Sequence, residues 1–172
     1  NLAPTTSTTV HMAMGDALAV SLLWARGFSA EDFAQYHPGG SLGKQLYLKV
    51  DDIYPNNDLP IVKETDLVKD SIVVISEKRL GAAAVVNEDD ELVGIFTDGD
   101  LRRMFEKTDS LSAVTMGEVM GKNPKTINKG EYALKALNKM REHNINHLIV
   151  VDQGKKVMGF LHIQDLFNEG IV

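Results

Sequence analysis

The chain has 172 residues, enough for one domain or two small ones with a hydrophobic core that needs no disulfide. Hydrophobic residues make up 44% of it and charged residues 24%, a composition that argues against disorder. The net charge is −6 and cysteine is absent. The composition therefore disfavours non-specific nucleic-acid binding and excludes a disulfide scaffold, a cysteine-ligated metal and a thiol nucleophile.

Neither a membrane span nor a signal peptide is predicted. The longest nearly apolar stretch, residues 17–25, is too short to cross a bilayer, and the chain does not open with a basic segment followed by an apolar one. Because the sequence starts at Asn1 rather than at Met, we interpret it as a fragment of a longer chain.

The first predicted element is a helix over residues 12–26, with Thr8 or Thr9 as its N-cap and Gly27 just after its end. Its apolar residues occupy nearly every face, which is typical of a helix buried on all sides. We therefore expect it to belong to a domain whose remainder lies outside this sequence.

A second, short helix is predicted to follow. Ser29 and Asp32 have the spacing of a capping box at its start. His37 should end it, because Pro38 follows and the residue before a proline avoids the α-helical region.

The rest of the chain contains an internal repeat. A shift of 65 residues aligns residues 80–101 with residues 145–166 without a gap, and the apolar pattern stays in register. Upstream, the same register aligns two amphipathic helical patterns. Each copy therefore reads strand, helix, strand, strand, helix. One copy is small for independent stability, so we expect the two to bury their sheet faces against each other.

The strongest local motif is GIFTDGD, residues 94–100, at a predicted strand-to-helix junction. Gly94 permits close approach of the backbone, Thr97 and the helix amides suit a phosphate, and the carboxylate of Asp100 suits the paired hydroxyls of a ribose. The same Thr97 and Asp100 also form the pattern of a capping box that needs no ligand. The motif alone leaves both interpretations open.

The second copy of the motif is GFLHIQD, residues 159–165. It retains the glycine and Asp165 but has His162 at the position of the hydroxyl. A plain capping box should lose one partner there, whereas a nucleotide site would become weaker or different. This difference favours two unequal sites.

The duplicated unit with this motif resembles a tandem pair of CBS domains, a Bateman module. The resemblance implies that the copies pack about a pseudo-twofold axis and leave clefts for adenine nucleotides or related ligands. It implies that Asp100 binds a ribose and Thr97 a phosphate, and that Asp165, with His162 beside it, takes the equivalent place in the other cleft. Apolar residues before the helices would sandwich a base, namely Val62 and Ile127.

Residues 1–9 (NLAPTTSTT), 14–19 (MGDALA) and 37–43 (HPGGSLG) resemble the end of a sugar isomerase (SIS) domain. In this order, ahead of a CBS pair, the whole chain resembles the bacterial D-arabinose 5-phosphate isomerase family. The resemblance implies interconversion of D-ribulose 5-phosphate and D-arabinose 5-phosphate for Kdo and lipopolysaccharide synthesis. It implies that His37 is catalytic, since an imidazole can transfer protons near neutral pH. The family's other catalytic residues would precede Asn1, so we expect this fragment alone to be inactive.

Other candidate sites fit less well. Residues 38–45 imitate a P-loop, but Pro38 replaces its first glycine and Gln45 its hydroxyl residue. We expect no metal site, because His143 and His147 straddle a predicted helix end and lack the H-E-x-x-H pattern. Two arginines could face a ligand phosphate or lie on the surface, with the surface favoured: Arg102 and Arg103.

The sequence thus predicts an α+β fold: tandem CBS domains of β-α-β-β-α repeats (residues 47–110 and 111–172) after the C-terminal helices of an α/β SIS domain (residues 1–46). We expect a cytoplasmic homo-oligomer, a dimer of CBS pairs in a tetrameric parent, that binds a sugar phosphate but neither nucleic acid nor membrane. No cofactor is required. The CBS pair would bind a nucleotide or nucleotide-sugar effector, such as an adenine nucleotide or CMP-Kdo, and residues 41–50 would pass the change to the catalytic domain.

Two alternatives remain open. The repeat could be a purely structural oligomerisation module with empty clefts, which a nucleotide-dependent rise in melting temperature would exclude. The protein could also be an SIS–CBS isomerase that acts on another sugar phosphate.

Overall fold

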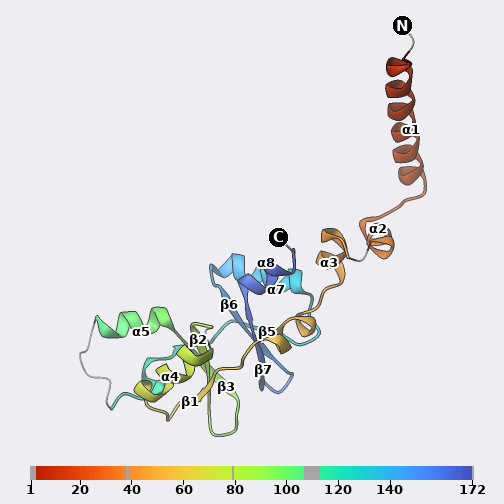
Figure 1. Ribbon diagram of the computed structural model, residues 1–172. Helices are drawn as coiled ribbons and strands as arrows, with labels where there is room; N and C mark the ends of the chain where they lie inside the picture. The colour runs from red at the N-terminus through yellow and green to blue at the C-terminus, as the bar shows by residue number, and fades with distance from the viewer. Residues whose placement is uncertain (1–2, 38, 79, 107–112, 172) are drawn as a thin grey trace.

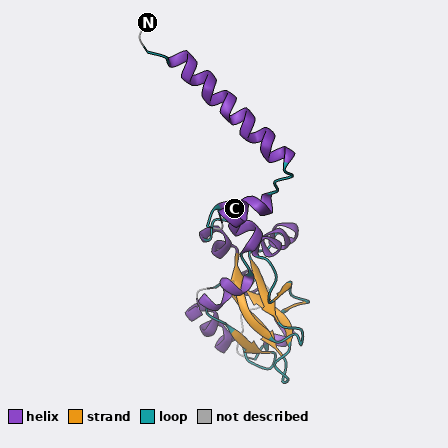
Figure 2. Ribbon diagram, turned by 90° about the vertical axis from the view of Figure 1, so that its right-hand side faces the viewer, coloured by secondary structure: helices purple, strands orange, loops and turns teal. Residues whose placement is uncertain are grey.

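The computed structural model describes residues 3–37, 39–78, 80–106 and 113–171. Three helices lead into two β-sheets that lie against each other, each with helices on its outer side (Figures 1 and 2). The leading elements are α1 (Thr5–Ala25), α2 (Ala30–Tyr36), α3 (Ser41–Tyr47) and the 3-10 turns η1 (Val50–Asp52) and η2 (Tyr54–Asn56).

The start of helix α1 differs from the sequence prediction. It begins at Thr5 with Pro4 at the N-cap, and the hydroxyls of Thr8 and Thr9 bond to carbonyls one turn earlier within the helix, so the predicted caps were wrong. No residue of α1 is buried, and Trp24 is 86% exposed. The helix projects away from the other elements in both views (Figures 1 and 2). Its apolar side chains therefore pack on no core of the described chain, and their burial against a remainder outside this sequence stays a prediction.

The start of α2 confirms the predicted capping box. The hydroxyl of Ser29 accepts from the amide of Asp32 at 3.1 Å, and the carboxylate of Asp32 accepts from the amide of Ser29 at 2.9 Å. His37 follows the last residue of α2, as predicted. Pro38, which belongs to the same motif, lies outside the described residues.

The two repeats have the predicted order of elements, and they match residue for residue. The antiparallel pairs β2·β3 and β6·β7 share the same register and the same irregularity, between Val85 and Val86 in one and between Val150 and Val151 in the other. This correspondence confirms the duplication. The elements of the first copy are β1 (Ile61–Lys63), α4 (Val68–Lys78), β2 (Ala82–Val86), β3 (Leu92–Thr97) and α5 (Asp98–Phe105); those of the second are β5 (Thr126–Asn128), α7 (Ala133–His143), β6 (His147–Val151), β7 (Val157–His162) and α8 (Ile163–Asn168).

A short connection between the copies adds one helix and one strand. Helix α6 (Met116–Val119) leads into β4 (Gly121–Lys122), which pairs with β3 and extends the first sheet to the order β1-β2-β3-β4. The second sheet keeps the order β5-β6-β7. The sequence analysis did not predict β4.

The two sheets face each other through alternate residues of their central strands. In β2, Ala82 and Ala84 point toward the partner sheet, where they pack with Ile149, Val151 and Phe160 in one cluster. The intervening residues of each strand pack instead in the core of a single repeat. Since side chains alternate along a strand, each sheet is buried on both faces, as predicted for paired repeats.

The segments that precede the repeats are exchanged between them. Val50 and Ile53, ahead of the first repeat, pack in the core of the second, together with Leu148 and Leu166. Conversely, Met116, ahead of the second repeat, packs in the core of the first. The core of the second repeat is therefore completed by chain from beyond the first repeat, whereas the core of the first repeat is completed by the connection that follows it.

In the described part of the chain, no helix combines the length and the apolar character that a bilayer crossing requires.

Candidate functional site

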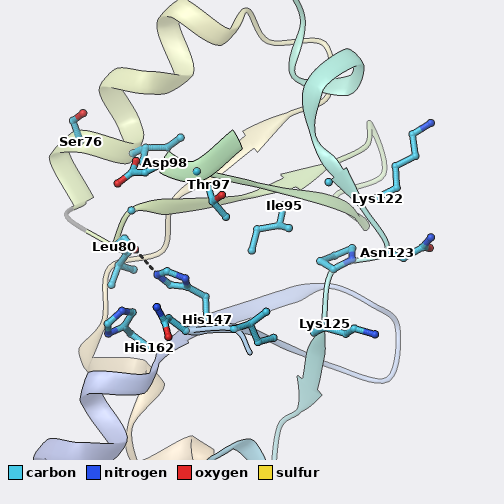
Figure 3. Close-up of a pocket in the computed structure, with 17 residues that line it drawn as sticks. Ser76, Leu80, Ile95, Thr97, Asp98, Lys122, Asn123, Lys125, His147 and His162 are labelled. Carbon is cyan, nitrogen blue, oxygen red and sulfur yellow. Dashed lines mark hydrogen bonds between the residues drawn. The ribbon is translucent and has the colours of Figure 1, made fainter. Parts of the chain in front are cut away.

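A cavity of about 870 Å³ lies where the two repeats meet. This volume is within the usual range for small-molecule sites. Both repeats and the connection between them contribute to its wall (Figure 3). The lining residues used below are Leu80, Ile95, Thr97, Asp98, Lys122, Asn123, Lys125, His147 and His162.

The cavity brings together two residues that the sequence analysis singled out separately. Thr97 ends β3 and His162 ends β7, at equivalent positions of the duplicated motif, and both line the same cavity. This meeting follows from the pseudo-symmetric packing of the sheets, which places the ends of β3 and β7 on one side of the seam (Figure 3). The two motifs therefore share one large cavity.

In the first copy, Thr97 and Asp100 form a capping box. The Thr97 hydroxyl accepts from the Asp100 amide at 3.3 Å, while Oδ2 of Asp100 accepts from the amide and the hydroxyl of Thr97 at 2.9 and 2.7 Å. The other carboxylate oxygen pairs with Arg103. Asp100 is not among the residues that line the cavity, and its binding of a ribose stays a prediction.

In the second copy, the imidazole of His162 replaces the hydroxyl without loss of the cap. Its Nδ1 accepts from the amide of Gln164 at 3.1 Å, and Oδ2 of Asp165 accepts from the amide of His162 at 2.8 Å. The expectation that a capping box loses a partner at His162 was therefore wrong, because an unprotonated ring nitrogen accepts a hydrogen bond as a hydroxyl does. Asp165 also lies outside the cavity wall and accepts from Asn57 at 2.7 Å.

His147 lies beside His162 in the same wall, with the ring centroids 4.7 Å apart. Its Nε2 is 2.6 Å from the carbonyl oxygen of Leu80 in the other repeat. Burial lowers the pKa of His147 below its ordinary value of 6.5, and the charge of the neighbouring His162 lowers it further. The Leu80 carbonyl and the carboxylates of Asp98 and Asp165 act in the opposite direction but do not cancel the effect of burial.

Charged groups lie at both ends of the cavity. Asp98 lies near Leu80 at one end, while Lys122 and Lys125 lie at the other (Figure 3). Asn123, between the lysines, has a φ of 57°, a left-handed conformation that asparagine tolerates better than most residues. The sharp turn at Asn123 places both lysines in the cavity wall.

The motif glycines have a packing role beneath the cavity. A Cβ on Gly94 would overlap the side chain of Met120, and a Cβ on Gly159 would overlap the ring of Tyr54. Met120 and Tyr54 come from the two exchanged segments. Burial of Tyr54 raises the pKa of its phenol above the ordinary value. Each glycine thus leaves room for a side chain of an exchanged segment, which is the close approach that the motif suggested.

Four of the remaining candidate residues lie away from the cavity. Val62 and Ile127 are each 4% exposed, belong to the two hydrophobic cores and are not among the residues that line the cavity, and their contact with a base stays a prediction. His37 follows α2, where its exposed ring packs on Phe33 with a centroid distance of 4.6 Å. Arg102 is exposed on α5.

No group of three or more His, Asp or Glu side chains in the described chain is arranged to hold a metal ion.

Several lining residues escaped the sequence analysis. Lys122 and Lys125 were not considered as site residues, and Asp98 was passed over within its motif. His147 was considered only as a zinc ligand with His143. A comparison of equivalent positions would have found it, because the register of 65 residues aligns His147 with Ala82 at the start of β2, on the buried seam.

The chain was compared with known proteins. It is 50% identical over 169 residues to "Arabinose 5-phosphate isomerase KdsD" of Francisella tularensis, in an alignment that covers 98% of this chain and 51% of that protein. The chain spans about half the length of the curated relatives it matches.

Solved structures share the fold of the paired repeats. A conserved protein from Pyrococcus horikoshii matches with a TM-score of 0.62 and 26% identity over 70% of this chain and 90% of that chain. A CBS domain protein from Pyrobaculum aerophilum, complexed with AMP, matches with a TM-score of 0.63 and 22% identity over 69% of this chain and 90% of that one. The sequence itself matches the CBS domain over residues 50–107 and 116–171. The chain therefore belongs to the CBS domain family and carries two such domains in tandem.

Proposed function

We propose that this chain is the regulatory part of an arabinose 5-phosphate isomerase and that its CBS pair binds a nucleotide or nucleotide-sugar effector. The observation that carries the effector proposal is the cavity of about 870 Å³ at the seam, lined by Thr97 of one motif and His162 of the other. The identity to KdsD over nearly the whole chain supports the parent activity. That activity is the interconversion of D-ribulose 5-phosphate and D-arabinose 5-phosphate, with His37 in the catalytic domain.

The chemistry of the cavity supports a ligand with an apolar ring and an anionic group. Ile95 and Leu80 provide apolar surface, and Thr97 with the imidazoles provides hydrogen-bonding groups. The ammonium groups of Lys122 and Lys125 would attract phosphate. Adenine nucleotides and CMP-Kdo both have these features.

The motif carboxylates take a different role in this proposal from the one implied by resemblance. The carboxylate of Asp100 accepts hydrogen bonds from Thr97, and that of Asp165 accepts one from the amide of His162. They hold the two lining residues in place and are positioning residues. Asp98 lines the cavity itself, and its carboxylate would accept hydrogen bonds from hydroxyl groups of the ligand.

The test is isothermal titration calorimetry of the chain with AMP, ATP and CMP-Kdo. We expect one ligand per chain, a rise in melting temperature on binding, and affinity at least tenfold weaker in Lys122→Gln/Lys125→Gln. Arg102→Gln, an exposed change outside the cavity, is the matched control and should bind as the native chain does. If none of the three compounds binds or raises the melting temperature, the CBS pair is a structural module and the effector proposal is wrong.

The parent activity has a separate test. The chain alone should not convert D-ribulose 5-phosphate, while the full-length parent should do so and lose activity in His37→Ala. Turnover by the chain alone would contradict the assignment of catalysis to residues outside it.

A further inference from the structure

The segment of residues 162–171, here called the α8 strut, connects the cavity with the N-terminal helices. It consists of His162, helix α8 and the residues that follow. One end lies in the cavity wall and the other end contacts α3.

At the cavity end, the strut begins with the ring of His162. Nδ1 of His162 accepts from the amide of Gln164 at 3.1 Å. A ring nitrogen that accepts cannot carry a proton, so the neutral ring has its proton on Nε2. His162 therefore caps α8 with one nitrogen and keeps the other as a donor for an acceptor group on a ligand.

The middle of the strut is firmly held. Oδ2 of Asp165 accepts from His162 and from Asn57, whose amide also donates to the carbonyl of Phe160 at 3.0 Å. Leu166 and Ile171 are buried in the core of the second repeat. Because a packed core shifts as a unit rather than deforming continuously, a displacement at His162 would be carried along the strut.

The far end of the strut holds α3 by two polar contacts. Lys44 Nζ pairs with Oε2 of Glu169 at 3.1 Å, and Nε2 of Gln45 donates to the carbonyl of Ile171 at 3.1 Å. In the described chain, the equivalent helix of the first repeat, α5, lies on the side of the molecule opposite to α3 (Figure 1). The connection between cavity and N-terminal helices is therefore made through the second repeat.

We propose that the α8 strut transmits occupancy of the cavity to α3. A ligand acceptor on Nε2–H of His162 restrains the ring, strengthens the cap of α8, and so favours the docked position of α3. Such coupling requires that the ligand bind the docked form better than the undocked form. The inference rests on the proposed function, since it assumes that the cavity binds a ligand.

The experiment is hydrogen–deuterium exchange of the chain with and without saturating AMP. The reporters are the α3 amides of Lys44 and Leu48, which bond to the carbonyls of Gly40 and Lys44. Their exchange should slow by about fivefold or more with AMP in the native chain, which is the lower range of measured couplings. In Gln45→Ala/Glu169→Gln, which removes both contacts with α3, AMP should still bind but leave α3 exchange unchanged.

Lys135→Gln is the matched control. It removes another exposed ion pair, with Glu131 at 2.8 Å, close to α3 but outside the strut, and it should keep the full response. The inference is overturned if AMP binds without slowing exchange in α3, or if the double variant keeps the response; the proposed function then stands. If AMP does not bind the native chain, the same experiment is done with ATP or CMP-Kdo, whichever binds, and absence of binding by all three compounds would overturn both.

Discussion

The imidazole of His147 joins the two repeats: its Nε2 lies 2.6 Å from the carbonyl oxygen of Leu80, which precedes β2 in the other copy. A carbonyl oxygen only accepts hydrogen bonds, so Nε2 of His147 carries the proton. This hydrogen bond satisfies a carbonyl in the wall of the cavity. It also explains why a histidine occupies the start of β6, where the first repeat has Ala82.

Replacement of His147 should therefore destabilise the chain. His147→Phe retains an aromatic ring but leaves the carbonyl of Leu80 without its partner. An unpaired, largely buried polar group costs about 1–3 kcal/mol. Urea unfolding followed by circular dichroism measures the loss. His143→Phe, at the end of α7 outside the cavity, should change stability by about 0.5 kcal/mol or less; equal effects of the two substitutions would contradict this role of His147.

The same residue predicts a pH dependence. The pKa of His147 is lowered in the folded state, mainly by burial, so below pH 6.5 the unfolded state binds more protons than the folded state. The stability it contributes is complete above pH 6.5 and is lost as the pH falls toward the folded-state pKa. Urea midpoints from pH 7.5 to 5 should therefore fall more steeply for the native chain than for His147→Phe. Parallel curves would show that His147 does not titrate in this way.

The cap formed by His162 gives a third prediction. His162→Ala removes the acceptor for the amide of Gln164 and should cost about 1 kcal/mol, as other N-cap losses do. His162→Thr supplies the hydroxyl found at Thr97 and should retain most of that stability. Urea unfolding of both variants checks this. Equal losses in the two variants would mean that the imidazole does not act as a cap.

The motif glycines should respond unequally to a methyl group. Gly94→Ala meets the flexible side chain of Met120, which can move, whereas Gly159→Ala meets the rigid ring of Tyr54. Overpacking lowers the free energy of unfolding by about 1–3 kcal/mol. The loss for Gly159→Ala should lie near the upper end of this range and the loss for Gly94→Ala near the lower end. Thermal unfolding ranks them. A double-mutant cycle with Tyr54→Ala should recover part of the Gly159→Ala loss, and strict additivity would be the contrary result.

The repeat was predictable because duplication leaves a periodic apolar pattern. Alignment of β2 and β3 with β6 and β7 was correct to the residue, including the shared irregularity after Val85 and Val150. The capping boxes at Ser29 and Thr97 were also predictable from the sequence, since each depends on two residues three positions apart. Local physical rules determine these features, so a single sequence is sufficient to find them.

The cavity was less predictable because its wall combines segments far apart in the sequence. Thr97 and His162 were found through their motif, but nothing local shows that they meet. Val62 and Ile127 were assigned to the ligand because they are apolar and precede helices, and the same properties place them in the cores. The role of Lys122 depends on the turn at Asn123 and on β4, a two-residue strand too short to leave a pattern.

The swap of Val50 and Met116 between cores means that the unit of duplication is not the unit of folding. A protein truncated between the two copies would separate each core from the side chain that fills it. The apolar surface exposed in this way would cause aggregation. A single copy that folds alone would have to carry the segment that precedes the other copy, because that segment fills its core. We therefore expect the two copies to be gained or lost together in evolution.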